Sequence, residues 1–226
     1  MEDYAVDTRS ASGQVERFAA EGKTPVYVAI DGRLAALIAI ADAVKAGSPE
    51  AVATLRKLGL RVVMLTGDHR RTAEAVAKAS GISLVVAEVL PEGKVAEVKR
   101  LQGEGEVVAM VGDGVNDAPA LAQADVGIAL GTGADIAREA SDVTLMRPDL
   151  RAVVSTILLA RRTMRVMKQN LFWAFVYNVV GIPVAAGALF PVFGLLLSPI
   201  LASAAMALSS VSVVANSLRL RRARLI

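Results

Sequence analysis

The sequence predicts an α/β domain built on a parallel sheet, followed by an α-helical hairpin that crosses a membrane twice. Short apolar strands alternate with helices from residue 48 to residue 146, an order that produces parallel strands. These strands are unbroken aliphatic runs, which are typical of a sheet covered by helices on both faces. Beyond them, residues 169–218 contain no Asp, Glu, Lys, Arg or His, a length that accommodates two spans of about 20 residues each.

The first forty residues predict a helical segment and a hairpin ahead of this alternation. Residues 1–22 are polar, and we expect them to be partly helical. "VYVAI" (26–30) and "LAALIAI" (34–40) are two apolar strands, and "DGR" (31–33) supplies the turn between them. The chain should therefore begin with a helix and a two-stranded hairpin.

Capping residues mark the helices of the alternating region. Ser48 is expected to cap the first of them, with Pro49 at the first helical position and Gly59 after its end. The helices are expected at 48–59, 70–81, 91–102, 116–124 and 133–140, and the strands at 61–67, 83–89, 106–112, 125–130 and 142–146. In such a sheet the functional site lies at the carboxyl ends of the strands.

The last third of the chain predicts a stalk and two membrane spans. Residues 149–168 repeat apolar side chains at helical spacing and run into spans at about 169–188 and 194–216, joined by a turn around Pro191. Basic residues flank the spans on both sides: Arg161, Arg162, Arg165 and Lys168, then Arg219, Arg221, Arg222 and Arg224. This pattern predicts that both ends of the hairpin lie in the cytoplasm. Nucleic-acid binding is the competing interpretation, disfavoured because the clusters adjoin the spans and form no stripe.

Two strand ends carry matching polar residues. "MLTGD" (64–68) and "MVGDG" (110–114) each finish an apolar strand with Gly and Asp, and a parallel sheet brings both to one edge. Thr66 offers a hydroxyl there, and the backbone N–H groups around Gly67 can form an anion-binding nest. A phosphate group would suit this edge.

Carboxylates and a lysine complete the candidate site. Asp113 and Asp117 supply hard oxygens, which suit Mg²⁺, and Lys94 begins a helix between the two strands, where its ammonium can neutralise a phosphate. Together these groups indicate phosphoryl transfer. Taken singly, Asp68 or Asp117 is more simply a helix N-cap, and Lys94 a solvated helix residue.

The wording of these motifs resembles one family. "MLTGD", "LPEGK" and "VGDGVNDAPALAQADVGIALGTGADIAREASD", followed by the apolar pair, are similar to the C-terminal part of P-type ATPases over essentially the whole chain. The resemblance implies a haloacid dehalogenase-like Rossmannoid phosphorylation domain. It implies residues 1–33 as the tail of the nucleotide-binding domain, 34–148 as the phosphorylation domain, and 149–226 as the stalk and two transmembrane helices.

The resemblance also implies roles for single residues, with ATP and Mg²⁺ as cofactors. The catalytic residues would be Thr66, Lys94 and Asn116. The residues that bind nucleotide and phosphate would be Thr66, Gly67 and Asp68. Those that hold Mg²⁺ would be Asp113 and Asp117.

The phosphorylated aspartate of the family is not found in this sequence. It belongs to a "DKTGT" motif, and neither that motif nor the family's "TGE" occurs in these 226 residues. We therefore expect an N-terminally truncated pump, inactive by itself, whose partner is the missing N-terminal half. The alternatives are a non-catalytic, membrane-anchored Mg²⁺- or phosphate-binding remnant and, disfavoured by the missing nucleophile, a free-standing phosphatase.

The apolar pair predicts the transported ion. "FWAFVYN" and "MALSSVSVVANSLRLR" resemble the copper(I)-transporting pumps, which implies a Cu(I) site with Tyr177, Asn178, Met206 and Ser210. A thioether suits Cu(I), and the segment offers no carboxylate for a harder ion. The alternatives are that these side chains only pack between helices, or that the ion is another heavy metal. We expect a cell-membrane location, contact with membrane lipid, and a copper chaperone as partner of the complete pump.

Overall fold

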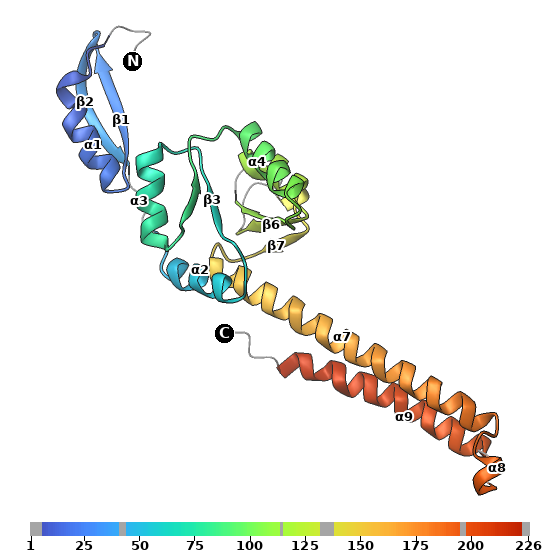
Figure 1. Cartoon of the computed structure of the whole chain (residues 1–226). Helices are drawn as coiled ribbons and strands as arrows, with labels where there is room; N and C mark the ends of the chain where they lie inside the picture. Colours follow the sequence, from blue (N-terminus) through green and yellow to red (C-terminus); the bar gives the residue numbers. More distant parts are fainter. Residues whose placement is uncertain (1–5, 41–43, 114, 132–137, 195–197, 223–226) are drawn as a thin grey trace. The chain divides into compact units, whose positions relative to one another are not determined.

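The computed structural model describes residues 6–40, 44–113, 115–131, 138–194 and 198–222, and for five residues of its last long helix (Pro199, Leu201, Ala202, Ala205 and Met206) only the backbone. The chain divides into two compact units, Met1–Val154 and Ser155–Ile226. The helix expected at 133–140 lies largely outside the described residues. Figure 1 shows the elements in chain order.

The first unit begins with a helix beside an antiparallel hairpin, as predicted. The 3₁₀ turn η2 (Arg9–Ala11) leads into α1 (Ser12–Ala20), and β1 (Thr24–Ile30) pairs with β2 (Arg33–Ile40). The loop between the strands is two residues long, Asp31 and Gly32, both with positive φ (51° and 74°). An Asp-Gly pair favours this turn because both residues tolerate left-handed backbone, so the turn sets the register of the hairpin.

The remaining strands pair in parallel, as predicted, but their hydrogen bonds divide them into two sheets. β3 (Val63–Leu65) pairs with β4 (Leu84–Val86), and β6 (Val126–Leu130) lies between β5 (Ala109–Gly112) and β7 (Val143–Leu145). The strands are shorter than the apolar runs that predicted them, because the ends of each run form the loops that carry the polar residues.

The helices of this unit follow the predicted alternation with one shift. They are α2 (Ser48–Lys57), α3 (Arg70–Ser80), α4 (Pro91–Gly103), the 3₁₀ turn η3 (Val115–Asp117) and α5 (Ala118–Gln123). The prediction that Ser48 caps α2 was wrong by one residue: Gly47 is the cap, with φ 89°, and its carbonyl accepts from the N–H of Ala51. Glycine suits position 47 because the Cβ of any other residue would lie only 2.9 Å from the Arg151 side chain.

The core of the first unit lies between these helices and the strands. Its largest fully buried side chains are Leu121, Val52, Val98 and Val154, one each from α5, α2, α4 and the first turn of α7. Ile128 and Ala129 bring the middle strand β6 into the same core. α4 and α5, whose ends carry Lys94 and Asp117, are in contact with each other.

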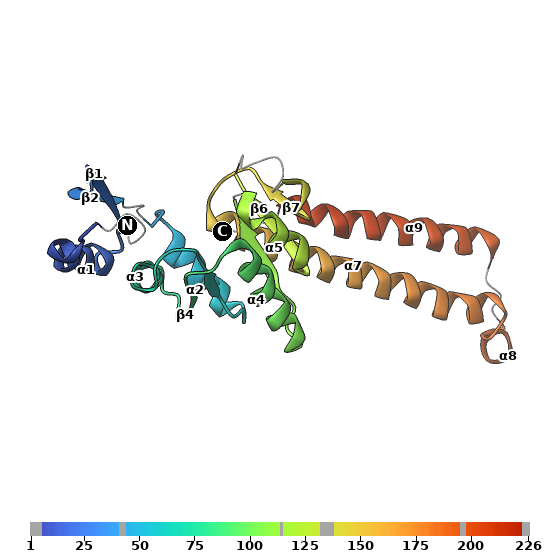
Figure 2. The same cartoon turned by 90° about the horizontal axis from the view of Figure 1, so that it is seen from above.

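The second unit is a helical hairpin. α7 (Leu150–Ala185) crosses the boundary between the units, and α8 (Phe190–Phe193) and α9 (Pro199–Leu218) follow, with the 3₁₀ turn η4 (Arg219–Arg222) at the end. Figures 1 and 2 show α9 side by side with the later part of α7. The turn predicted around Pro191 falls in α8.

The two predicted membrane spans are not confirmed. Within the part of the chain that the structure describes, no helix combines the length and the apolar character needed to cross a membrane.

Candidate functional site

An ion pair between Lys94 and Asp117 forms the centre of the candidate site. Lys94 Nζ lies 2.6 Å from Asp117 Oδ1, and only 15% and 14% of the two side chains are exposed. Lys94 stands in the first turn of α4, and Asp117 caps the amino end of α5, so the contact between these helices joins residues 23 apart in sequence. The sequence indicated both residues as members of the candidate site but did not predict that they form an ion pair.

Gly112 allows Asp117 to take this position. It is the last residue of β5, and a Cβ added there would lie 2.7 Å from Asp117 Cβ and 2.8 Å from Oδ2. Such contacts are shorter than real Cβ atoms make, so any side chain at residue 112 must displace the carboxylate. The second Asp117 oxygen, Oδ2, therefore faces the end of β5, whereas Lys94 contacts the first, Oδ1.

Thr66 and Asp68 form a small closed loop at the end of β3. The Thr66 hydroxyl donates to Asp68 Oδ2 at 2.9 Å, and the Asp68 N–H donates to Thr66 Oγ1 at 3.1 Å. Gly67 lies between them, exposed. A hydroxyl has one proton to donate, so Thr66 can donate to a phosphate only if its hydrogen bond to Asp68 Oδ2 breaks.

The loop after β4 anchors this turn, which the sequence did not reveal. The N–H groups of Val89 and Glu88 donate to the carbonyls of Thr66 and Asp68, both at 3.0 Å. Glu88 adopts φ 60°, unusual for a residue other than glycine. Lys94 follows five residues after Val89, so the backbone connects the Thr66 turn directly to the helix that carries Lys94.

Asp113 and Asn116 are exposed on the turn between β5 and α5, and Gly114 lies outside the described residues. The donor set fits a hard cation such as Mg²⁺, because it combines the Asp113 carboxylate with the Asp117 oxygen that Lys94 leaves unused. Among the described residues, no group of three or more His, Cys, Asp or Glu side chains could hold a metal ion. A cation here would need further ligands from water or phosphate.

Asp125 fixes the strand that leads to the site. Its Oδ2 accepts from the N–H of Val108 at 2.8 Å and from Gln102 Nε2 at 3.2 Å. These hydrogen bonds hold the pKa of Asp125 below its usual value, and the bond from the Val108 N–H has the largest effect. Gln102 also donates to the carbonyl of Gln123 at 3.1 Å, so this carboxylate helps to tie α4 and α5 to the start of β5.

The predicted Cu(I) ligands are described only in part. Tyr177 lines a pocket of the hairpin together with Ser212, and Asn178 donates from Nδ2 to the carbonyl of Ala174 in its own helix, at 2.8 Å. Ser210 is exposed, and the Met206 side chain lies outside the described residues. The structure therefore leaves the predicted ion site untested.

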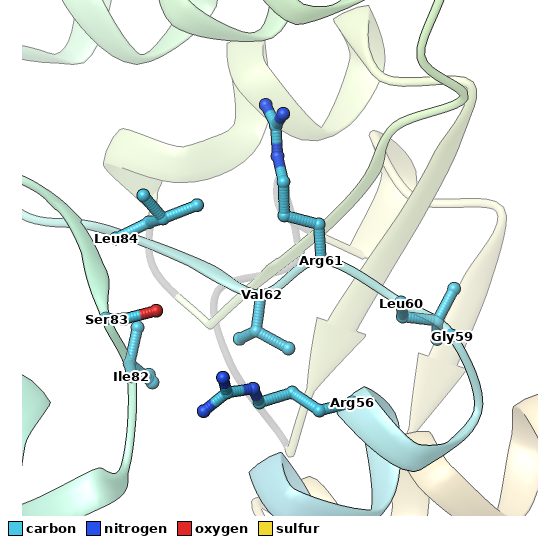
Figure 3. Close-up of a pocket in the computed structure, with 8 residues that line it drawn as sticks. All are labelled: Arg56, Gly59, Leu60, Arg61, Val62, Ile82, Ser83 and Leu84. Carbon is cyan, nitrogen blue, oxygen red and sulfur yellow. The ribbon is translucent and has the colours of Figure 1, made fainter.

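A second pocket opens at the other end of β3 and β4, away from the strand ends discussed above. In Figure 3 the Arg56 side chain reaches toward Ile82 and Ser83, while Arg61 points away from it. Arg56 Nη1 donates to the carbonyl of Gly81 at 3.2 Å, and Arg61 lies 3.5 Å from Glu106 Oε1. Nearby acceptors already engage both guanidinium groups.

Comparison with known proteins identifies the relatives of this chain. Residues 2–125 match the family of haloacid dehalogenase-like hydrolases. Over 97% of its length the chain is 59% identical to a probable copper-transporting ATPase, PacS, of Synechococcus elongatus, of which it covers 30%. It is 57% identical, also over 97% of its length, to a silver exporting P-type ATPase of Salmonella typhimurium, of which it covers 26%.

Solved structures agree with these sequence relatives. The crystal structure of a zinc-transporting PIB-type ATPase in its E2.Pi state matches 95% of this chain with a TM-score of 0.77 at 35% sequence identity. The chain covers 34% of that structure. It thus spans about a quarter to a third of the length of the proteins it matches.

Proposed function

Because the chain belongs to the haloacid dehalogenase-like hydrolases and is homologous over nearly its whole length to copper-transporting P-type ATPases, we propose that it forms the phosphorylation domain and two membrane helices of a copper(I) pump. The pump would couple ATP hydrolysis to Cu(I) transport. The observation that carries the phosphoryl-transfer part is the shielded Lys94–Asp117 pair, with the exposed Asp113 four residues before Asp117 in the chain.

In this proposal Lys94 neutralises a phosphate bound at the edge formed by the ends of β3 and β5. Its ammonium is fixed by Asp117 at 2.6 Å and is largely shielded from water. A charge that is positioned in advance and shielded in this way interacts more strongly with a phosphate than a mobile surface lysine does.

Thr66 would then bind the phosphate by exchanging its acceptor. The hydroxyl now donates to Asp68, and a phosphate oxygen at the end of β3 would replace that carboxylate as the acceptor. The N–H of Gly67, which lies in the exposed part of this turn, would support the same phosphate. Asp68, released from Thr66, is assigned to the nucleotide side of the site.

Asp113 and Asp117 would hold Mg²⁺, with Asn116 supporting the metal–phosphate arrangement. When bound, Mg²⁺ would neutralise the phosphate oxygens. The aspartate that accepts the phosphate in P-type ATPases belongs to a motif absent from these 226 residues. We assign it to the remaining part of a complete pump.

We further propose that the uncharged parts of α7 and α9 insert into the cell membrane, with both ends in the cytoplasm. Large apolar side chains all along this part of α7 are exposed, among them Phe172 (60%), Phe175 (61%), Val179 (67%) and Ile182 (66%). Such a surface is unfavourable in water and is expected to be covered. Lipid would cover it, and the basic residues on both sides fit the cytoplasmic surface.

The transported ion is assigned as Cu(I), bound by Met206 with Tyr177, Asn178 and Ser210. Residues 150–226 contain no Asp or Glu, so this part of the chain offers no carboxylate to a divalent ion. Met206 supplies a thioether, a soft donor that suits Cu(I). A copper chaperone is the expected donor of the ion to the complete pump.

The test is metal-stimulated ATP hydrolysis by the complete protein that contains this chain. Cu(I) should stimulate and Zn²⁺ should not. Met206→Leu keeps the side-chain volume and removes the sulfur, so stimulation should fall about tenfold or more. Met164→Leu, at an exposed position earlier in α7, is the matched control and should behave like the unchanged protein. Stimulation by Zn²⁺ alone, or equal activity of the two variants, would contradict the ion assignment.

A further inference from the structure

A pocket of about 350 Å³ lies between α7 and α9 at the end where α9 finishes. One face of α7 contributes Gln169, Trp173 and Tyr177, each four residues after the last, so the three stand in a row along the helix. From the other side, Asn216 and Arg219 stand at the end of α9. The pocket is therefore polar and basic at one end and aromatic farther along the hairpin.

Side-chain amides fix the polar end of this pocket. Asn216 Nδ2 donates to Asn170 Oδ1 at 2.8 Å, and Asn170 Nδ2 donates to Ser217 Oγ at 2.9 Å. Gln169 accepts from Asn216 through Oε1 at 3.4 Å, a contact that does not use its own amide protons. Among the residues that the structure describes, the Arg219 guanidinium makes only one polar contact, a long one of 3.4 Å from Nη1 to Asn216 Oδ1. Gln169 and Arg219 thus offer donors to an anion.

The charge of this unit also favours an anion. From residue 150 to residue 226 the sequence contains no Asp or Glu, so within the hairpin no side-chain carboxylate can compete for Arg219. Lys168 precedes the pocket on α7, and Arg221 and Arg222 follow it in η4. A phosphate that entered the pocket would meet positive charge from both helices.

The aromatic end indicates that the phosphate belongs to a lipid. Trp173 and Tyr177 remain 52% and 41% exposed, and rings of this kind favour the boundary between lipid headgroups and acyl chains. Past them the hairpin surface is apolar and exposed on both helices, as at Val179 and Val211. A free phosphate would use none of this surface, whereas acyl chains would cover it.

We propose that this pocket binds an anionic membrane phospholipid, with its phosphate at Arg219 and Gln169 and its acyl chains along Trp173 and Tyr177. The inference rests on the proposed insertion of the hairpin into a membrane. It goes beyond that function, because a lipid bound at this point would bridge α7 and α9 at their basic ends and would make the protein selective for anionic membranes.

Trp173 permits a direct test, because it is the only tryptophan of the chain. The 226-residue chain is reconstituted in phosphatidylcholine nanodiscs, and quenching of its fluorescence is compared between spin-labelled phosphatidylglycerol and spin-labelled phosphatidylcholine at equal fractions. We expect about fivefold preference for phosphatidylglycerol, the value for one arginine near an anionic headgroup. Arg219→Gln should abolish the preference. Arg162→Gln, which removes an equal charge at an exposed position of α7 before the pocket, should retain it.

Four results would overturn the proposal, and they separate it from the proposed function. Equal quenching by both lipids in an inserted chain, or equal losses in the two arginine variants, would reduce the pocket to general surface charge. Inorganic phosphate that removes the preference at millimolar concentration would make it a site for free anions. Failure of Trp173 emission to shift to shorter wavelength in neutral nanodiscs would contradict insertion itself, and the lipid site with it.

Discussion

Replacement of Gly112 by Ala should disrupt the candidate site without replacing any of its charged residues. The added Cβ would lie 2.7 Å from Asp117 Cβ and 2.9 Å from Cγ, so the aspartate must move and its 2.6 Å contact with Lys94 must open. Overpacking of this kind typically costs about 1–3 kcal/mol, and we expect a loss of about 2 kcal/mol in the free energy of unfolding. In a domain of this size that corresponds to a fall of about 4–8 °C in Tm.

Thermal unfolding of the 226-residue chain, followed by circular dichroism, measures this effect. Gly103→Ala is the control: Gly103 ends α4, nothing lies within 4 Å of its added Cβ, and Ala there should be neutral or stabilising by up to about 1 kcal/mol. On an Asp117→Gly background, which removes the obstructing side chain, Gly112→Ala should cost almost nothing. If Gly112→Ala matched Gly103→Ala in stability, the close approach of Asp117 to β5 would be refuted.

Three further predictions concern the charges around this edge. Lys94→Met should lower the free energy of unfolding by about 1–3 kcal/mol, because it leaves the shielded Asp117 carboxylate unpaired. In urea titrations, added Mg²⁺ should recover part of this loss. An unchanged urea midpoint would contradict the ion pair between Lys94 and Asp117. Mg²⁺ should shift backbone amide signals at the end of β5, an effect that Asp113→Ala removes and Asp31→Asn keeps; shifts that survive Asp113→Ala would exclude this ligand. Since its folded-state pKa is lowered, Asp125 should stabilise the fold above about pH 4 and lose this effect as the pH falls through that pKa. On acidification, Tm of the unchanged chain should therefore drop more steeply than Tm of the Asp125→Asn variant. Parallel curves of Tm against pH would contradict a stabilising role of the Asp125 carboxylate.

Local signals in the sequence were sufficient for most of the first unit. The Asp31-Gly32 turn predicts the hairpin because few residues adopt positive φ, and Gly81 predicts the end of α3 for the same reason. The cap of α2 was misplaced because the position before Ser48 is fixed by a left-handed glycine packed against Arg151, a contact 104 residues away that no local pattern reveals.

The sequence predicts the residues of the candidate site, and that assignment stays a prediction, whereas the contacts between these residues could not be predicted. Thr66, Lys94, Asp113 and Asp117 were chosen because the carboxyl ends of parallel strands meet at one edge of a sheet. In the structure β3 and β5, which end beside Thr66 and Asp113, belong to two different sheets. The pairing of Lys94 with Asp117 depends on how α4 packs against α5 and on the missing Cβ at residue 112, which are tertiary properties. The hydrogen bonds from Glu88 and Val89 to the Thr66 turn join backbone N–H and carbonyl groups, so the pattern of side chains in the sequence does not reveal them.

The central claim, that this edge serves phosphoryl transfer, is tested most directly by phosphoenzyme formation in the complete protein. Incorporation of acid-stable label from ATP in the presence of Mg²⁺ and Cu(I) would be compared between Asp113→Asn and Asp31→Asn, the same substitution at a turn of the hairpin where Asn tolerates the φ of 51°. The account predicts a loss of about a hundredfold or more for Asp113→Asn and none for Asp31→Asn. Full labelling of Asp113→Asn would contradict it.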